Sequence, residues 1–298
     1  GAVFDNPDLI AATVIGDGEA ETGPLAASWH SNSFLDPAVD GAVLPILHLN
    51  GYKIANPTIL SRMPESQLVK LLEGYGYRPH FVTVQDPDAV MAAHEDFAAA
   101  LSTCRAEIQA IQAPYRTGEK LAVPADAPGA ADVDPHAPRW PMIVFRSPKG
   151  WTGPREVDGK PVEGTWRAHQ VPLSEVHDNP EHLAQLQEWL QSYRPEELFD
   201  GEGRLRGEIA SLAPAGNLRM SATPYANGGR LLQDLRQPSY AEFAVDIAEP
   251  GSERVSPMLN LGRYLAEIIR LNPENFRIFG PDETASNRLQ EVYGVTDK

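Results

Sequence analysis

The sequence predicts an α/β fold built on a doubly wound, mostly parallel sheet. Four apolar stretches have the length and composition of buried strands: 9–15, 42–49, 80–85 and 140–146. Segments with helical patterns separate them, and strands that alternate with helices form parallel sheets with right-handed crossovers. Two of the stretches run directly into polar residues, Asp17 in the first case and Asn50 in the second.

The segments between the strands have apolar residues at helical spacing or are rich in proline. Three segments are predicted helices: 65–75, 87–112 and 180–193. The first of them follows Pro64, which suits the start of a helix. Residues 113–139 contain five prolines spread along their length and are predicted as a surface loop.

A change in composition after residue 193 predicts a different kind of structure. Residues 194–255 are rich in proline, glycine and polar residues, so we expect an extended linker with at most short helices. A helix over 256–271 and a strand over 276–279 then begin a second α/β unit. The predicted regions are therefore 1–193, 194–255 and 256–298.

The composition limits the classes of partner. The 298 residues carry a formal net charge of −16, which argues against binding of nucleic acid or of an anionic membrane surface. A single cysteine, Cys104, excludes an internal disulfide and a cysteine-based metal site, and we expect a cytoplasmic location. We expect neither a transmembrane helix nor a signal peptide, because no apolar run has the required length or flanks.

Asp17 and Asn50 are the candidate metal ligands. Ligands of open α/β sheets bind at the carboxyl ends of the strands, and these two residues follow two neighbouring predicted strands. Mg²⁺ prefers a few protein oxygens together with phosphate oxygens. A Gly-Asp-Gly sequence alone is also typical of a simple turn, so the prediction depends on Asn50 as much as on Asp17.

The motifs around these residues resemble those of a known family. Gly16-Asp17-Gly18-Glu19 and the later Asn50 resemble the thiamine diphosphate (ThDP) motif of transketolase-like enzymes. Longer segments narrow the resemblance to the phosphoketolases, and they extend over nearly the whole chain: 16–25, 28–32, 40–58, 146–154, 164–172 and 279–288.

The resemblance implies an enzyme that uses ThDP and Mg²⁺. Phosphoketolases cleave xylulose 5-phosphate or fructose 6-phosphate with inorganic phosphate to acetyl phosphate and an aldose phosphate, and their sites lie between the subunits of a homodimer. By this resemblance 1–193 belongs to the diphosphate-binding domain, 194–255 to the linker and 256–298 to the beginning of the pyrimidine-binding domain. A transketolase-type transfer of two carbons, or a non-catalytic binding module, are the alternatives.

The resemblance also assigns the candidate cofactor ligands. Asp17 and Asn50 would bind Mg²⁺ through their side chains, and Tyr52 would bind it through its backbone carbonyl. Three further residues surround the diphosphate in this assignment: Gly16, Gly18 and Glu19. The glycines let the backbone approach closely, while Glu19 either accepts hydrogen bonds near the cofactor or is an ordinary carboxylate at the start of a helix.

Lys149, His169 and Glu283 are the candidate catalytic residues. Lys149 and His169 would contact the cofactor and substrate and act in proton transfer and oxyanion or phosphate binding. An acidic residue near the partner subunit's cofactor is either Asp282 or Glu283, and we favour Glu283. A helix N-cap is the alternative role for Asp282.

The sequence leaves the roles of two other histidines open. His48 lies inside an apolar strand, where a hydrogen-bonded core histidine is the usual reading, and His30 lies in a segment that is compatible with a structured loop. Arg146 precedes Lys149 by three positions and can point to the other side of the sheet.

The ends lead us to expect an internal piece of a longer protein. Residue 1 is glycine, and the last residues follow closely on the predicted start of a second unit. We see no match for the glutamate that activates ThDP and expect it after Lys298. The chain alone is therefore expected to be inactive.

Overall fold

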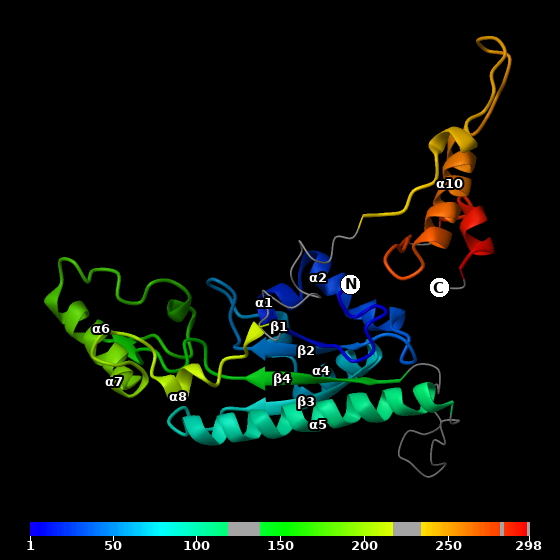
Figure 1. Ribbon diagram of the computed structural model, residues 1–298. Helices are drawn as coiled ribbons and strands as arrows, with labels where there is room; N and C mark the ends of the chain where they lie inside the picture. The colour runs from blue at the N-terminus through cyan, green and yellow to red at the C-terminus, as the bar shows by residue number, and fades with distance from the viewer. Residues whose placement is uncertain (119–137, 217–233, 281–282, 297–298) are drawn as a thin grey trace. The chain divides into compact units, whose positions relative to one another are not determined.

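The computed structural model describes residues 1–118, 138–216, 234–280 and 283–296. Its contacts divide the chain into two compact units, Gly1–Pro214 and Ala215–Lys298, which are described separately. The first unit contains a sheet of four parallel strands in the order β1-β2-β4-β3 (Figure 1). The strands are β1 (Ile10–Gly16), β2 (Ala42–Leu49), β3 (Tyr77–Thr83) and β4 (Trp140–Arg146). The predicted α/β fold with a parallel sheet is confirmed.

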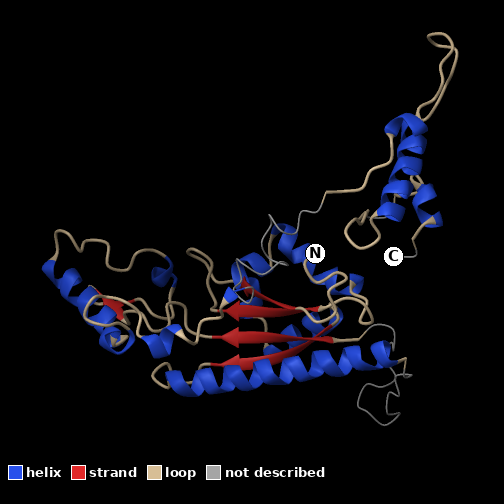
Figure 2. Ribbon diagram, viewed as in Figure 1, coloured by secondary structure: helices blue, strands red, loops and turns tan. Residues whose placement is uncertain are grey.

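The register of the sheet brings the carboxyl ends of the strands to one edge. β1 pairs with β2 from Ile10 opposite Ala42 to Gly16 opposite His48. β3 pairs with β4 along its whole length, so Thr83 lies opposite Arg146. Figure 2 shows all the arrowheads of this sheet pointing the same way. The segments that leave the strands therefore begin close together.

Helices pack along the sheet, and short ones follow β1 and β2. The elements of this part are α1 (Asp17–Ala20), α2 (Gly23–Ser28), η1 (Trp29–Phe34), α3 (Ile59–Arg62), α4 (Glu65–Gly74) and α5 (Val90–Thr117). Figure 1 shows α5 running along the sheet beside β3. The buried core contains apolar side chains from the strands and from α4 and α5, among them Leu47, Leu68, Leu72, Ile108, Met142, Ile143 and Val144.

Helix α5 continues beyond its predicted end, so the predicted loop over 113–139 begins too early. Pro114 lies inside the helix, although a proline cannot donate a backbone hydrogen bond. Two side chains of the last turns bond to backbone carbonyls that lie outside the helix. Gln112 donates to the carbonyl of Asp40, and Arg116 donates to the carbonyl of Pro7. These tertiary bonds stabilise the turn that contains the proline. Residues 119–137 lie outside the described part.

A smaller substructure follows β4. It contains β5 (Glu156–Val157), β6 (Lys160–Pro161), η3 (Trp166–His169), α6 (Pro180–Ser192), α7 (Pro195–Leu198) and α8 (Gly207–Ala210). β5 and β6 form an antiparallel hairpin. Val157 of β5, Val162 and Leu173 make a separate apolar cluster. The two short strands of this hairpin were not predicted, because two-residue strands leave no periodic pattern in a sequence.

The second unit contains the predicted helix but not the predicted strand. α10 (Pro257–Leu271) confirms the helix, and η5 (Tyr240–Phe243) and η6 (Gln290–Gly294) accompany it. The prediction of a strand over 276–279 is wrong, because these residues are irregular. A strand needs a neighbouring strand to pair with, and no strand occurs among the described residues of this unit. The assignment of 194–255 and 256–298 to a linker and a domain stays a prediction.

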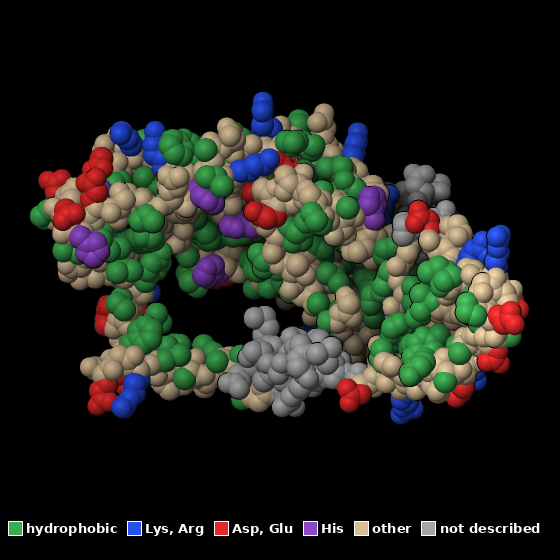
Figure 3. Space-filling model, turned by 90° about the horizontal axis from the view of Figure 1, so that it is seen from above, with side chains coloured by type: hydrophobic (Ala, Val, Ile, Leu, Met, Phe, Trp, Pro, Cys, Tyr) green, Lys and Arg blue, Asp and Glu red, His purple; other side chains and the backbone are tan. Residues whose placement is uncertain are grey.

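Helix length and surface charge bear on membrane and nucleic-acid contacts in the described part of the chain. None of its helices combines the length and the apolar character needed to cross a bilayer. On the face drawn in Figure 3, Lys and Arg side chains are scattered among Asp and Glu, without an extended basic patch.

We predict that Cys104 resists alkylation in the folded protein. Its side chain is fully buried, and burial raises the pKa of the thiol to about 11, so little of the reactive thiolate forms at about pH 8. Iodoacetamide should label the peptide that contains Cys104 in urea but not under native conditions, as measured by mass spectrometry. Complete labelling of the native protein on the same timescale would contradict the packing of α5 on the sheet.

Candidate functional site

Asp17 is the most buried charged group at the carboxyl edge of the sheet. It begins α1 directly after β1, and only 1% of its surface is exposed. Its Oδ2 atom accepts hydrogen bonds from the backbone N–H of Gly51, at 2.7 Å, and from the Thr58 hydroxyl, at 3.0 Å. Among the described residues, no hydrogen bond ends on Oδ1. One oxygen is thus fixed by the protein and the other keeps its lone pairs for a ligand.

Asn50 precedes the residue whose amide binds this carboxylate. It follows β2 directly, and Asp17 binds the amide of the next residue, Gly51. The side-chain oxygen of Asn50 accepts a hydrogen bond from the backbone N–H of Tyr52, at 3.2 Å. The structure therefore brings the two predicted metal ligands to the same edge of the sheet.

The loop over 51–58 folds back on itself and returns to Asp17. Gly51 has a φ of +95°, which side chains rarely adopt. Its carbonyl accepts a hydrogen bond from the amide of Thr58, and Tyr52 forms a bridge with Pro57. Because the loop closes in this way, Gly51 and Thr58 can hold the same oxygen of Asp17.

Lys149 reaches this loop from the neighbouring strand β4. Its ammonium group donates a hydrogen bond to the carbonyl of Tyr52, at 3.0 Å. A carbonyl oxygen has two lone pairs, so the one that Lys149 leaves free can face a cation. The predicted third metal ligand and the predicted catalytic lysine are thus in direct contact.

His169 ends the short helix η3 and is exposed. Its segment is tied to that of Lys149, because the amide of Gly164 donates to the Lys149 carbonyl at 2.8 Å. Gly150 also lies against Ala168, and a Cβ atom at Gly150 would be 2.5 Å from the Cβ of Ala168. Gly150 has a φ of +72° in addition. The structure brings the segments of His169 and Lys149 together, and no hydrogen bond to a described residue holds the imidazole.

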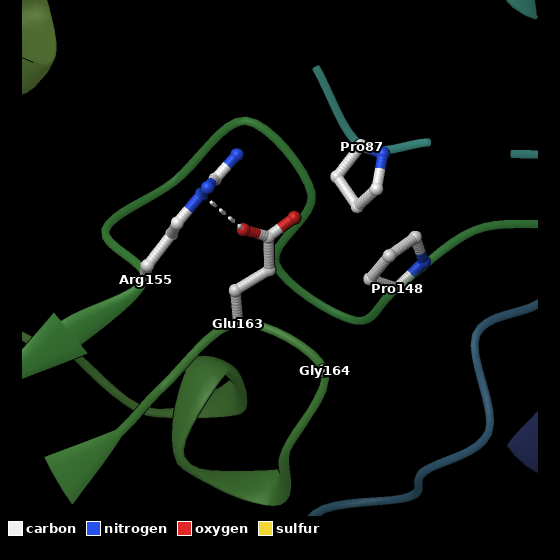
Figure 4. Close-up of a pocket in the computed structure, with 5 residues that line it drawn as sticks. All are labelled: Pro87, Pro148, Arg155, Glu163 and Gly164. Atoms are coloured by element: carbon white, nitrogen blue, oxygen red, sulfur yellow. Dashed lines mark ion pairs between the residues drawn. The ribbon is translucent and has the colours of Figure 1, made fainter. Parts of the chain in front are cut away.

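A cavity of about 380 Å³ lies on the same segments (Figure 4). Its lining residues are Pro87, Pro148, Arg155, Glu163 and Gly164. One carboxylate oxygen of Glu163 faces Arg155, with 3.6 Å between Oε2 and Nε, while the other points toward Pro87. Burial raises the pKa of Glu163, although Arg155 acts in the opposite direction. The cavity adjoins the loop of Lys149 through Pro148 and Gly164.

His48 is held at the same edge, between the metal ligands and Lys149. Its Nε2 atom is 2.8 Å from the hydroxyl of Ser147, and its ring stacks on Phe145. Burial lowers the pKa of His48, Asp17 raises it and Lys149 lowers it further. The imidazole is therefore neutral near pH 7 and contributes a hydrogen-bonding group, not a charge.

The other sequence candidates near β1 and β4 lie as follows. Glu19 is exposed, and its carboxylate turns back toward Gly16. A Cβ atom added at Gly16 would lie 2.3 Å from Oε2 of Glu19. A Cβ at Gly18 would be 3.3 Å from the Cγ of Lys53. Arg146 forms an ion pair with Glu65, and its guanidinium group lies over the ring of Phe81. His30 is exposed and makes an edge-to-face contact with the ring of Tyr75.

Glu283 belongs to the second unit. It is exposed, and its carbonyl accepts a hydrogen bond from the amide of Asn287, at 2.8 Å. Asp282 lies outside the described residues. The role of either acid near a cofactor therefore stays a prediction.

Several residues of the site were missed from the sequence. Gly51 and Thr58 hold Asp17, Ser147 holds His48, and Glu163 lines the cavity. The first three lie within the segments quoted above, and Glu163 immediately precedes one of them. Their spacing gives no sign of these contacts, because the contacts of Gly51, Thr58 and Ser147 join segments that are far apart in the chain. Only the register of the sheet and the closed loop create them.

The donor set suits a hard cation. In the described part of the chain, no three His, Cys, Asp or Glu side chains come together as a conventional metal cluster. The edge instead offers the carboxylate of Asp17, the amide oxygen of Asn50 and the backbone carbonyl of Tyr52, and the amide of Gly51, between the last two residues, binds Asp17. Oxygen ligands of this kind, few in number, fit Mg²⁺ that also binds phosphate oxygens.

The parallel sheet and its carboxyl edge define an α/β protein of the class that binds ligands at strand ends. A family model described as "XFP N-terminal domain" matches residues 1–231, and one described as "D-xylulose 5-phosphate/D-fructose 6-phosphate phosphoketolase" matches residues 259–298. The chain therefore belongs to the phosphoketolase family.

Similar proteins extend over the whole chain. Proteins described as probable phosphoketolases are 58% identical over 298 residues in Mycobacterium avium, 57% over 298 in Synechococcus elongatus and 55% over 300 in Chlorobaculum tepidum. Each match covers 100% of this chain but only 35% or 36% of the relative. The chain thus spans about a third of the length of the curated relatives it matches.

The lowered pKa of His48 predicts a pH-dependent term in stability. Below pH 6.5, the ordinary pKa of histidine, His48 binds a proton more readily in the unfolded chain than in the folded chain. The contribution of His48 to the free energy of unfolding is therefore complete above pH 6.5 and is lost as the pH falls through the lower pKa of the folded state. His48→Gln should weaken the dependence of the free energy of unfolding on pH, measured by urea denaturation between about pH 5 and pH 8. His30→Gln is the control, because His30 is exposed. An unchanged dependence in His48→Gln would contradict the prediction.

Proposed function

We propose that this chain contributes the Mg²⁺ and diphosphate site of a ThDP-dependent phosphoketolase. The complete enzyme would cleave xylulose 5-phosphate or fructose 6-phosphate with inorganic phosphate to acetyl phosphate and an aldose phosphate. The observation that carries the proposal is the Asp17 carboxylate, with Oδ2 held by Gly51 and Thr58 and no hydrogen bond from a described residue on Oδ1. The family membership supports it. A cytoplasmic homodimer is part of the proposal.

The ligands of the metal follow from the donor set. Asp17 and Asn50 would bind Mg²⁺ through side-chain oxygens, and Tyr52 through its carbonyl, with diphosphate oxygens completing the coordination. Gly16 and Gly18 would let the diphosphate approach the backbone, and Glu19 would lie at its margin. Residues 1–193 would then be part of the diphosphate-binding domain, and 256–298 would begin the pyrimidine-binding domain.

The residues of this chain would orient the reactants and move protons. ThDP supplies the nucleophilic carbon and the electron sink when it is bound. Lys149 would place a positive charge where negative charge develops on the substrate or on inorganic phosphate. His169 would hold or transfer a proton at a substrate hydroxyl, since its imidazole is exposed and has no hydrogen bond to a described residue.

Two further residues would support these roles. His48, neutral near pH 7 and bound to Ser147, would offer a hydrogen-bonding group at the same edge without adding charge beside the metal. Glu283, from the second unit, would be the acid that approaches the cofactor of the partner subunit in the dimer. The cavity at Glu163 would leave room for the segment of Lys149 and His169 to adjust.

The proposed activity predicts acetyl phosphate as the product. The full-length protein that carries this sequence should form acetyl phosphate from xylulose 5-phosphate when ThDP, Mg²⁺ and inorganic phosphate are present, as measured by hydroxamate formation. The same reaction without phosphate is the control. Transfer of two carbons to an added aldose without acetyl phosphate would favour a transketolase-type enzyme, and no reaction or ThDP binding would favour a non-catalytic module.

Asp17 should be required for Mg²⁺-dependent binding of ThDP. Asp17→Asn removes the charge and keeps the size of the side chain, so the metal loses its only carboxylate among the proposed ligands. Calorimetry with the full-length protein should show loss of ThDP binding that depends on Mg²⁺. The matched control is Asp40→Asn, because Asp40 is equally buried, at 1% exposed, and accepts backbone hydrogen bonds before β2. Unchanged ThDP affinity in Asp17→Asn would refute the metal assignment.

A further inference from the structure

Glu21 is a buried carboxylate that none of the roles above uses. It follows α1 directly, and its side chain is only 5% exposed. Its Oε2 atom accepts hydrogen bonds from the backbone N–H groups of Ile59, at 2.6 Å, and Leu60, at 3.0 Å. Its Oε1 atom lies 2.6 Å from the ammonium nitrogen of Lys53, oriented as an ion pair and not as a directed hydrogen bond. A buried carboxylate with this many donors is strongly fixed.

These contacts fasten the loop over 51–58 at both ends. Lys53 lies near the start of the loop, and Ile59 follows its last residue, Thr58. The Lys53 side chain also covers Gly18, and the Lys53 amide donates to the carbonyl of Asn56 at 2.8 Å. Glu21 therefore connects the segment after β1 to both ends of the segment after β2.

The fastened loop carries the groups that define the candidate metal site. The Gly51 amide and the Thr58 hydroxyl hold Oδ2 of Asp17, and the Tyr52 carbonyl lies between them in the chain. Thr58 is fully buried, and its hydroxyl also accepts a hydrogen bond from the amide of Ser61. A shift at either end of the loop would move these donors away from the carboxylate.

The charge of Glu21 matters as well as its size. A carboxylate only accepts hydrogen bonds, so it can face two N–H groups and an ammonium group at once. An amide of the same shape would turn its NH₂ group toward one of these donors, which creates a repulsive contact in a buried place. A glutamine at this position would therefore release one end of the loop.

We propose that Glu21 is a positioning residue for the Mg²⁺ site. It acts through the loop over 51–58 and does not touch the metal: it holds Gly51, Tyr52 and Thr58 where they orient Asp17 and complete the ligand set. This inference rests on the proposed function, because it requires that the site takes a divalent cation.

The test is the affinity of the full-length protein for Mn²⁺ in the presence of ThDP, measured by electron paramagnetic resonance. Glu21→Gln should raise the Kd for Mn²⁺ by roughly 10- to 100-fold, the usual effect of removing a group that orients a metal ligand. Without metal, the midpoint of thermal unfolding of Glu21→Gln should fall no further than that of Glu107→Gln, which would show that the fold is not selectively weakened. Glu107 is the matched control, since this partly buried carboxylate pairs with His80 and Arg78 at the β3 side of the sheet.

The outcomes distinguish failure of the proposed Mg²⁺ and ThDP site from failure of the positioning role of Glu21 alone. If the wild-type protein takes up no Mn²⁺ with ThDP, the proposed function fails and the role of Glu21 fails with it. If the wild-type protein binds Mn²⁺ and Asp17→Asn does not, an unchanged Kd in folded Glu21→Gln overturns the role of Glu21 alone. If Glu21→Gln does not fold, Lys53→Met decides: a raised Kd supports the proposal, and an unchanged Kd overturns it.

Discussion

The site depends on one shared acceptor, the Oδ2 atom of Asp17. The Gly51 amide and the Thr58 hydroxyl both donate to it, and they come from the two ends of the loop that follows β2. These bonds join the ends of two parallel strands and satisfy a carboxylate that is almost fully buried. They also decide which oxygen of Asp17 remains for a ligand. Without them, a buried charge would lack partners, which is costly in a protein interior.

The parallel sheet makes this arrangement possible. β1, β2 and β4 are neighbours, so the residues that follow them meet at one edge. Lys149 crosses from β4 to the Tyr52 carbonyl, and His48 lies between this lysine and Asp17 with a lowered pKa. The result is an edge where the Asp17 carboxylate, the Lys149 ammonium group and the neutral imidazole of His48 come from three neighbouring strands. Such an edge suits a metal-bound anion better than a uniformly charged pocket would.

Much of the fold and part of the site follow from the sequence, for identifiable reasons. β2 and β4 have the boundaries expected from continuous apolar runs, and α10 ends where its apolar spacing predicts and begins one residue later, at Pro257. The strand over 276–279 failed because apolar residues alone do not supply a hydrogen-bonded neighbour. The end of α5 was misjudged because Arg116 and Gln112 bond to carbonyls that are distant in the chain.

The sequence by itself determined the elements, the likeness to the phosphoketolases and the residues that can bind a hard cation, because apolar periodicity and residue chemistry are local properties. The tertiary structure decided how these residues are held. Glu21 fastens a loop that begins after Asn50, Gly150 packs against Ala168 so that His169 comes to the segment of Lys149, and Thr58 returns to Asp17. The contacts of Glu21 and Thr58 join the segments after β1 and β2, which the parallel pairing of these strands brings together, and the contact of Gly150 joins two turns that both follow β4.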